Sequence, residues 1–117
     1  MSRFVIREVP TGIKFDLKAG NGQTVLTSEV YATEATCRQG VASVIKNAPS
    51  APVEDHTLEV YKVCKNPKFE VYQDRAGGFR FRLKARNGQI IGVSERYERK
   101  LSCLEGIESV RLNAAEE

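Results

Sequence analysis

The stretch LKAGNGQ, at Leu17–Gln23, returns with one substitution as LKARNGQ at Leu83–Gln89. The agreement continues in the same register: Ser28, Glu29, Tyr31, Cys37, Gly40, Ser43, Val44, Asn47 and Ala48 match Ser94, Glu95, Tyr97, Cys103, Gly106, Ser109, Val110, Asn113 and Ala114. The chain is therefore a tandem duplication. We expect residues 1–117 to form a single domain of two repeats, about 1–64 and 65–117.

Each repeat has the pattern of three strands followed by a helix. The strands are expected at 4–8, 13–19 and 23–28, and again at 69–73, 79–85 and 89–94. The second strand of each repeat alternates apolar and charged residues, which is typical of an antiparallel strand with one face on a core. The Asn-Gly pairs predict tight hairpins with positive φ at both turn positions.

The period changes to that of a helix after the third strand. An apolar stripe is formed by Cys37, Val41, Val44 and Ala48, and is repeated by Cys103, Ile107 and Val110. The segments at 36–39 and 102–105 fit the capping-box template, with a start at Thr33 as the alternative. Asn47 and Asn113 suit a helix end. Glycines inside the helices, Gly40 and Gly106, indicate close packing on the sheet rather than a phosphate loop.

One repeat has too little core to be stable alone, because burial efficiency falls with chain size. We therefore expect an α+β fold in which both repeats share one antiparallel sheet and both helices pack on the same face. Residues 49–56 are loop-like. Residues 57–64, TLEVYKVC, are rich in β-formers and predict an extra strand after the first helix.

The repeated motifs F-x-L-K-A-x-N-G-Q, S-E-x-Y and C-x-x-G-[VI]-x-S-V-x-x-N-A resemble those of the YegP-like family, small bacterial and archaeal proteins of unknown function. The resemblance implies β3-αβ units joined through a common antiparallel sheet with exchanged C-terminal strands, so that 58–64 would be the exchanged strand of the first repeat. Only AAEE follows Asn113, so the second exchanged strand is expected to be missing or vestigial. That leaves one sheet edge less covered and favours dimerisation or addition of a partner strand.

Composition narrows the class of protein. Apolar residues make up 41% and charged residues 28% of the 117, and the net charge is +3, well below that of a dedicated nucleic-acid protein. Three cysteines without close spacing argue against a disulfide framework. The sequence has no signal peptide pattern and no apolar stretch long enough for a membrane span, so we expect a soluble cytoplasmic protein with no membrane partner.

The sequence has few residues that could act as a catalytic nucleophile or a metal ligand. Cys37 and Cys103 fall on the apolar stripes and are expected to be buried hydrophobes rather than ligands. His56 is the single histidine, which disfavours both a zinc site and a Cys–His nucleophile. We therefore expect no catalytic residue, no metal and no cofactor, and a protein that is not an enzyme.

Two sets of polar residues are candidates for function. The repeated Ser28, Glu29 and Tyr31, with Ser94, Glu95 and Tyr97, could bind a small ligand or satisfy the strand-to-helix connection. A basic row is placed by alternation on the open sheet face: Arg80, Arg82, Lys84 and Arg86, with Tyr72, Lys14 and Lys18 as further members. This row could track phosphates and stack a base, or it could form cross-strand ion pairs with Asp16 and Glu70.

We therefore expect a small non-catalytic interaction module of unknown process, binding an unidentified protein partner or itself as a homodimer. The alternative is weak, sequence-tolerant binding of single-stranded nucleic acid through the basic row.

Overall fold

The computed structural model describes residues 3–116. Its elements in chain order are β1 (Phe4–Val9), β2 (Gly12–Lys18), β3 (Thr24–Ser28), α1 (Glu34–Asn47), the 3-10 turn η1 (Ala48–Ser50), β4 (Val53–Asp55), β5 (Lys68–Gln73), β6 (Phe79–Lys84), β7 (Ile90–Val93) and α2 (Lys100–Ala115). The strands form a 7-stranded sheet in the order β1-β2-β3-β7-β6-β5-β4.

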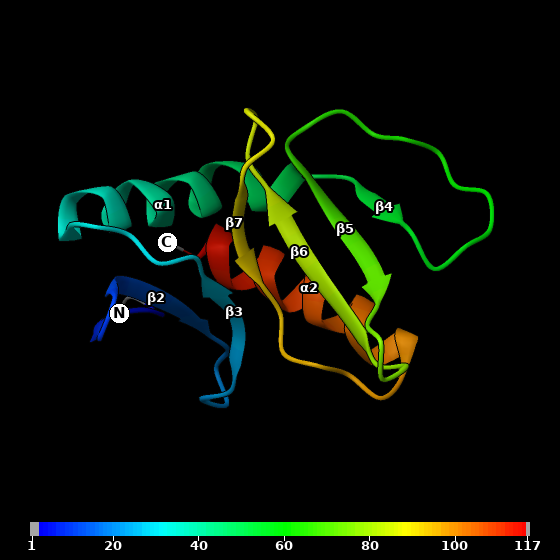
Figure 1. Cartoon of the computed structure of the whole chain (residues 1–117), viewed down its shortest axis with the longest axis horizontal. Helices are drawn as coiled ribbons and strands as arrows, with labels where there is room; N and C mark the ends of the chain where they lie inside the picture. The colour runs from blue at the N-terminus through cyan, green and yellow to red at the C-terminus, as the bar shows by residue number, and fades with distance from the viewer. Residues whose placement is uncertain (1–2, 117) are drawn as a thin grey trace.

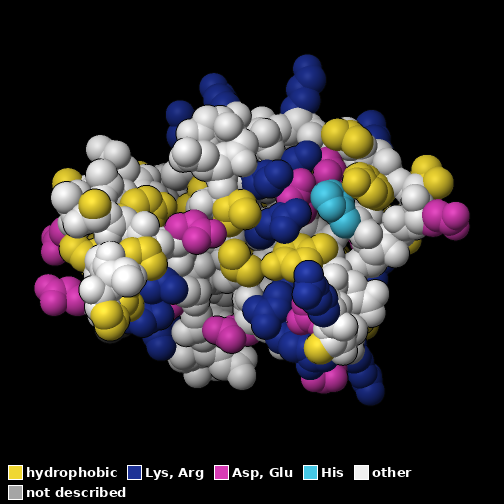
Figure 2. All heavy atoms as spheres, in the orientation of Figure 1, with side chains coloured by type: hydrophobic (Ala, Val, Ile, Leu, Met, Phe, Trp, Pro, Cys, Tyr) yellow, Lys and Arg dark blue, Asp and Glu magenta, His cyan; other side chains and the backbone are white. Residues whose placement is uncertain are grey.

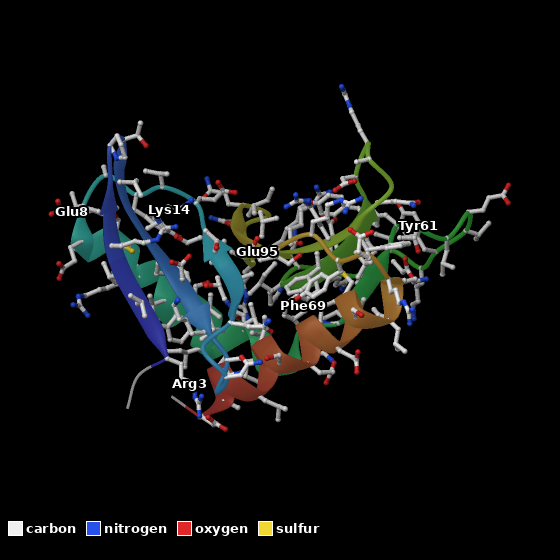
Figure 3. The ribbon with its side chains drawn as sticks, turned by 90° about the horizontal axis from the view of Figure 1, so that it is seen from below. Arg3, Glu8, Lys14, Tyr61, Phe69 and Glu95 are labelled. Atoms are coloured by element: carbon white, nitrogen blue, oxygen red, sulfur yellow. The ribbon has the colours of Figure 1, made fainter. Side chains whose placement is uncertain are left out.

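The molecule has two layers, with the sheet on one side and both helices on the other (Figure 1; Figure 3). α1 packs on β2 and β7, and α2 lies across β2, β3, β5 and β6. The largest core side chains are contributed equally by both repeats: Phe15, Leu17, Leu26 and Val44, with Phe69, Phe81, Leu83 and Ile107. The predicted α+β fold, with two repeats on one sheet and both helices on one face, is confirmed.

The sheet is symmetric about the β3–β7 pair, where the two repeats meet. All neighbouring strands are antiparallel except β4 and β5, which are parallel, so the sheet is mixed. β4 follows the helix of the first repeat and pairs with the first strand of the second. It is therefore the exchanged strand that the sequence predicts.

The predicted position of that strand, 58–64, is wrong. The exchanged strand is Val53–Asp55, and residues 58–65 form a loop. Ala51, 1% exposed, is buried just before the strand, and the Asp55 carboxylate accepts hydrogen bonds from Thr57 that turn the chain away from the sheet. Composition favours β-formers at 58–64, but burial and turn chemistry place the strand earlier.

The Asn-Gly hairpins also differ from the prediction. Gly22 and Gly88 have φ of 86°, but no non-glycine residue in 3–116 has positive φ. Asn21 and Asn87 therefore have negative φ, contrary to the prediction. The amide of Gln23 donates to the side-chain oxygen of Asn21 at 3.0 Å, and the Ala19 amide donates to the Gln23 carbonyl at 2.8 Å. These loops are three-residue turns closed by a glycine bulge, not two-residue turns.

The helix starts lie earlier than the capping-box segments at 36–39 and 102–105. Thr33 caps α1 by accepting from the Thr36 amide at 3.1 Å, and the Thr36 hydroxyl completes the box, which confirms the alternative start. Arg99 precedes α2 without a side-chain cap. α1 ends at Asn47 as predicted, whereas α2 continues past Asn113 to Ala115. Within 3–116, neither helix is long and apolar enough to cross a membrane.

Candidate functional site

The basic row of β6 lies on the open sheet face, but carboxylates neutralise most of it. Arg82 donates to Glu70 at 2.6 Å, and the Lys84 ammonium lies 3.4 Å from the same carboxylate. Arg80 pairs with Asp74 at 3.3 Å and also donates to the Ser94 carbonyl. The Arg82 guanidinium lies 4.7 Å from the centre of the Tyr72 ring, so this ring is covered by a cation.

Two residues of this row belong to a group of paired charges that we call the Glu54–Glu70 cluster. Its members are Glu54, His56, Lys68, Glu70, Arg82 and Lys84. Glu54 and Glu70 are each 3% exposed. The Lys68 ammonium lies 2.7 Å from Glu54 and 3.6 Å from Glu70, and His56 contacts Glu54 at 2.6 Å. Figure 2 shows these basic side chains gathered around acidic ones beside the histidine.

The cluster keeps both carboxylates charged. The hydrogen bond from Lys68, helped by those from the Cys64 amide and His56, lowers the pKa of Glu54 to about 2. Burial alone would raise the pKa of Glu70, but the hydrogen bond from Arg82 and the charges of Arg82 and Lys84 outweigh it and lower that pKa. The pKa of Lys68 is raised by its bond to Glu54. The cluster therefore attaches β4 to β5 and β6 by fixed charges.

The ligand atoms of Glu54, His56 and Glu70 lie within 4.8 Å of one another, close enough to share a metal ion. However, the Lys68 ammonium already contacts both carboxylates. A metal would have to displace an internal cation, so the geometry favours a structural role for the cluster.

The sequence predicted that Arg82 and Lys84 could pair with Glu70 across strands, but it did not predict that Glu54, His56 and Lys68 join them, because these residues lie outside the repeated motifs. The missed signal was the sequence VEDH at 53–56, a short alternating stretch with a charge on the open face.

The remaining basic members of the predicted row carry no ion pair with residues 3–116: Lys14, Lys18 and Arg86. Lys14 lies with Arg7 and Arg80 around a hollow of about 360 Å³ at the junction of the repeats, which Glu29 and Glu95 also line. The structure therefore does not join the predicted row into one continuous cationic surface, since Arg86 lies near α1 instead.

The repeated serines and tyrosines are used within the fold. The Ser28 hydroxyl accepts from the Phe15 amide at 2.9 Å and donates to the Glu29 carbonyl at 2.7 Å. Ser94 does the same with Phe81 and Glu95. Tyr31 stacks on Phe15, and Tyr97 on Phe81, with ring centres 6.4 Å apart in both repeats. Of these serines, glutamates and tyrosines, only Glu29 and Glu95 are exposed.

An apolar groove lies at the outer edge of the sheet, between β1 and α1. This β1 groove, of about 270 Å³, is lined by Phe4, Ile6, Arg38, Val41, Ala42 and Ile45. Within residues 3–116, β1 has β2 on one side and no strand on the other. The sequence predicted a less covered edge, but not the groove beneath it.

The second repeat contains the same groove in a filled state. Val71 corresponds to Ile6, and Ile107 to Val41; these two residues of the second repeat are 0% and 1% exposed. The segment Ala51–Asp55 runs along β5 in this repeat. The Phe69 amide donates to the Pro52 carbonyl at 2.8 Å, and the amide of His56, which follows the segment, donates to the Val71 carbonyl at 2.8 Å. Their counterparts Ile6 and Val41 are only half-buried.

The aromatic packing at the base of the two grooves is alike. Phe4 meets Phe15 edge-on at 5.7 Å and 64°, and Phe69 meets Phe81 at 5.8 Å and 74°. The helix side differs: α2 has Leu104, Glu108 and Arg111 where α1 has Arg38, Ala42 and Ile45. Arg111 donates to the Ala51 carbonyl and covers Phe69. Figure 3 shows Phe69 enclosed between the sheet and α2.

A duplicated β3-α unit with an exchanged strand defines the class of protein. The family model described as "Domain of unknown function (DUF1508)" matches residues 12–55 and again 74–117, so the chain belongs to that family.

Relatives agree with this assignment. The UPF0339 protein YegP of Escherichia coli K12 is 39% identical over 100 residues, covering 86% of this chain and 77% of its own. The UPF0339 protein plu2779 of Photorhabdus laumondii is 40% identical over 95 residues, covering 81% and 70%. A UPF0339 protein of Treponema denticola is 64% identical over 47 residues, which is 40% of this chain and 81% of its own length.

Two solution NMR structures have the same fold. The YegP structure from E. coli, titled as a protein of unknown function, has a TM-score of 0.76 at 33% identity and covers 98% of this chain and 89% of its own. UPF0339 protein SO3888 from Shewanella oneidensis has a TM-score of 0.78 at 31% identity, covering 97% and 86%. The fold and family are thus established, while the relatives carry no known activity.

Proposed function

We propose that the protein is a small non-catalytic interaction module that binds an extended polypeptide segment in the β1 groove. The segment would run parallel to β1, as β4 runs parallel to β5. Main-chain hydrogen bonds to an exposed strand edge supply affinity, and pockets for alternate side chains supply specificity. The single observation that carries the proposal is that the equivalent groove of the second repeat is already filled by such a segment.

The filled groove defines the chemistry of the partner. Ala51 and Val53 face the helix layer, and Glu54, between Val53 and Asp55, faces the open side toward Lys68. Arg3 is at the position of Lys68 in the first repeat, and there it pairs with Glu116, the C-cap of α2, at 3.1 Å. A fitting partner segment therefore has small or β-branched apolar residues at alternate positions and an acidic residue between them.

Strand register supports the same edge. The Lys18 amide donates to the Arg3 carbonyl, so Arg3, Val5 and Arg7 bond toward β2 and the main chain of Ile6 points outward. In the second repeat, Val71 at the position of Ile6 accepts from the exchanged segment. The outward carbonyl of Ile6 is thus placed to accept a hydrogen bond from a partner amide.

The proposal is tested with a labelled peptide of residues 48–56, the segment that fills the equivalent groove, titrated against the whole protein by fluorescence anisotropy. We expect saturable binding that is lost with Ile45→Glu, which puts a charge in the groove. Gln39→Glu, on another face of α1, adds the same charge and should leave binding unchanged. A Val53→Asp peptide should not bind. Absence of binding, or binding indifferent to Ile45→Glu, would overturn the proposal.

A second candidate is weak, sequence-tolerant binding of single-stranded nucleic acid at the hollow between the repeats. It is favoured by Lys14, which has no ion pair within 3–116 and lines that hollow with Arg7 and Arg80. Labelled single-stranded DNA at low and near-physiological salt tests it, with Lys14→Glu/Lys18→Glu beside the natural protein. Binding that weakens steeply with salt and is lost in the variant supports it. No binding at low salt rejects it.

A further inference from the structure

The loop at residues 58–63 has strand-forming side chains with no strand to join. Leu58 is 49% exposed, Val60 85% and Val63 72%, in a stretch whose β-branched and aromatic residues favour extended structure. Exposed apolar side chains grouped in one segment mark an interaction surface more often than scattered ones do.

Both ends of this loop are held in place. Thr57 donates twice to the Asp55 carboxylate, and the Cys64 amide donates to Glu54 at 2.7 Å. Lys68 also donates to the Cys64 carbonyl at 3.1 Å. The Tyr61 ring stacks on His56 at 4.5 Å. The Glu54–Glu70 cluster thus presents the segment outward, beyond β4, as Figure 3 shows at Tyr61.

From these observations we infer that Leu58–Lys62 of one copy adds as a parallel strand to the β1 groove of a second copy. The inference rests on the proposed function, because it takes the β1 groove to be a strand-binding site, and it names the partner as this chain itself. Among residues 3–116, each copy has a groove beside β1 that no strand fills and a strand-forming segment that pairs with no strand, so the segment of one copy can fill the groove of the next.

The side-chain pattern of the loop matches the pattern that fills the equivalent groove. Alternation would direct Leu58 and Val60 into the groove, as Ala51 and Val53 are directed in the second repeat. Glu59 would then face the open side of β1, where Arg7 lies in an ion pair with Asp16. In the second repeat Glu54 faces the same side of the sheet, beside Lys68.

The positions of the two surfaces fix the type of assembly. β1 is at one end of the sheet, and the loop follows β4 at the other end. Figure 1 shows the two at opposite sides of the molecule. The contact is therefore head-to-tail, and successive copies extend the assembly rather than closing a two-fold dimer.

Sedimentation of the whole protein over a range of concentrations tests the inference. The weight-average mass should rise above the 13.0 kDa of one chain and continue past that of a dimer. Val60→Glu and Ile45→Glu should each abolish this rise. Leu112→Glu, at an apolar residue of α2 that is 67% exposed and lies outside both surfaces, should leave it unchanged.

Mixing the two defective variants gives the decisive result. Val60→Glu retains the groove, and Ile45→Glu retains the loop, so together they should form a 1:1 complex that grows no further. A protein that stays at 13.0 kDa throughout, or a mixture that forms no complex, would overturn the inference. The peptide of residues 48–56 would still bind in that case if the proposed function holds, so the two failures are distinguishable.

Discussion

The Tyr31 hydroxyl lies directly over Gly40, so that a Cβ atom at this position would come within 2.2 Å of the hydroxyl oxygen and 3.1 Å of Phe15. Tyr97 and Gly106 repeat the contact in the second half at 2.4 Å. The tyrosine of the S-E-x-Y motif and the glycine of the helix motif are therefore one packing unit. This explains why each helix contains a residue of low helix propensity.

Gly40→Ala is expected to destabilise the protein. Overpacking against a stacked aromatic ring costs about 1–3 kcal/mol, which exceeds the roughly 1 kcal/mol that alanine gains in a helix. Urea unfolding measures the difference. Tyr31→Phe combined with Gly40→Ala should cost less than the two single changes added together, because the hydroxyl makes the closest contact. Strict additivity would contradict this account.

Glu54→Gln should strongly destabilise the protein, because Lys68 is then left buried with only Glu70 at 3.6 Å. Breaking a buried ion pair on one side costs about 3–5 kcal/mol. Glu34→Gln is the matched control, since its i,i+4 pair with Arg38 is exposed and is worth about 0.3–0.5 kcal/mol. Equal losses in free energy of unfolding would show that the cluster is not structural.

Stability should fall in acid. The folded-state pKa of Glu54 is about 2 against an ordinary 4.5, so its contribution is fully present above 4.5 and is lost as pH falls toward 2. The lowered pKa values of Glu70, Asp55 and Asp74 act in the same direction. The urea concentration at the midpoint of unfolding should decrease in the natural protein as the pH is lowered from 4.5 toward 2. Glu54→Gln should show a shallower decrease, and an identical slope would refute the assignment.

One thiol of the three should react readily in the folded protein. Burial raises the pKa of Cys103 to about 11 and also raises that of Cys37, and both are fully buried, whereas Cys64 is partly exposed on the loop. A chromogenic disulfide reagent should therefore titrate one thiol before unfolding and three after it. Cys64→Ser should remove the fast phase, and persistence of that phase would place the reactive thiol elsewhere.

Much of the fold was predictable because the duplication gives two sequences for each strand and helix, and a pattern found in both is more reliable than one found once. The alternation at Phe15 and Leu17 predicted the core face of β2, and the repeated stripe from Cys37 predicted the buried face of α1. The exchanged strand was misplaced because a short strand is fixed by local burial at Ala51 and a turn at Asp55, not by composition.

The candidate sites were less predictable for a different reason. Alternation correctly put Arg82 on the open face, but the carboxylate that neutralises it is on a neighbouring strand and is joined there by Glu54 from the linker. The β1 groove exists because no strand among residues 3–116 pairs with the outer edge of β1, and a local sequence pattern does not predict such an absence. The ligand-binding alternative for Glu29 and Glu95, the repeat boundary near residue 64 and the cytoplasmic location stay predictions.

The strand exchange at β4 has a consequence for the order of folding. The segment that completes the core of the second repeat precedes that repeat in the chain, so it has already been synthesised when Phe69 and Ile107 emerge. The segment that contains β4 can therefore pair with β5 as β5 forms, so the second repeat folds against a strand that the chain has already supplied. A circular permutant that joins the two ends and opens the chain after residue 57 places residues 51–55 behind α2, and it should slow folding of the second half while preserving the final sheet.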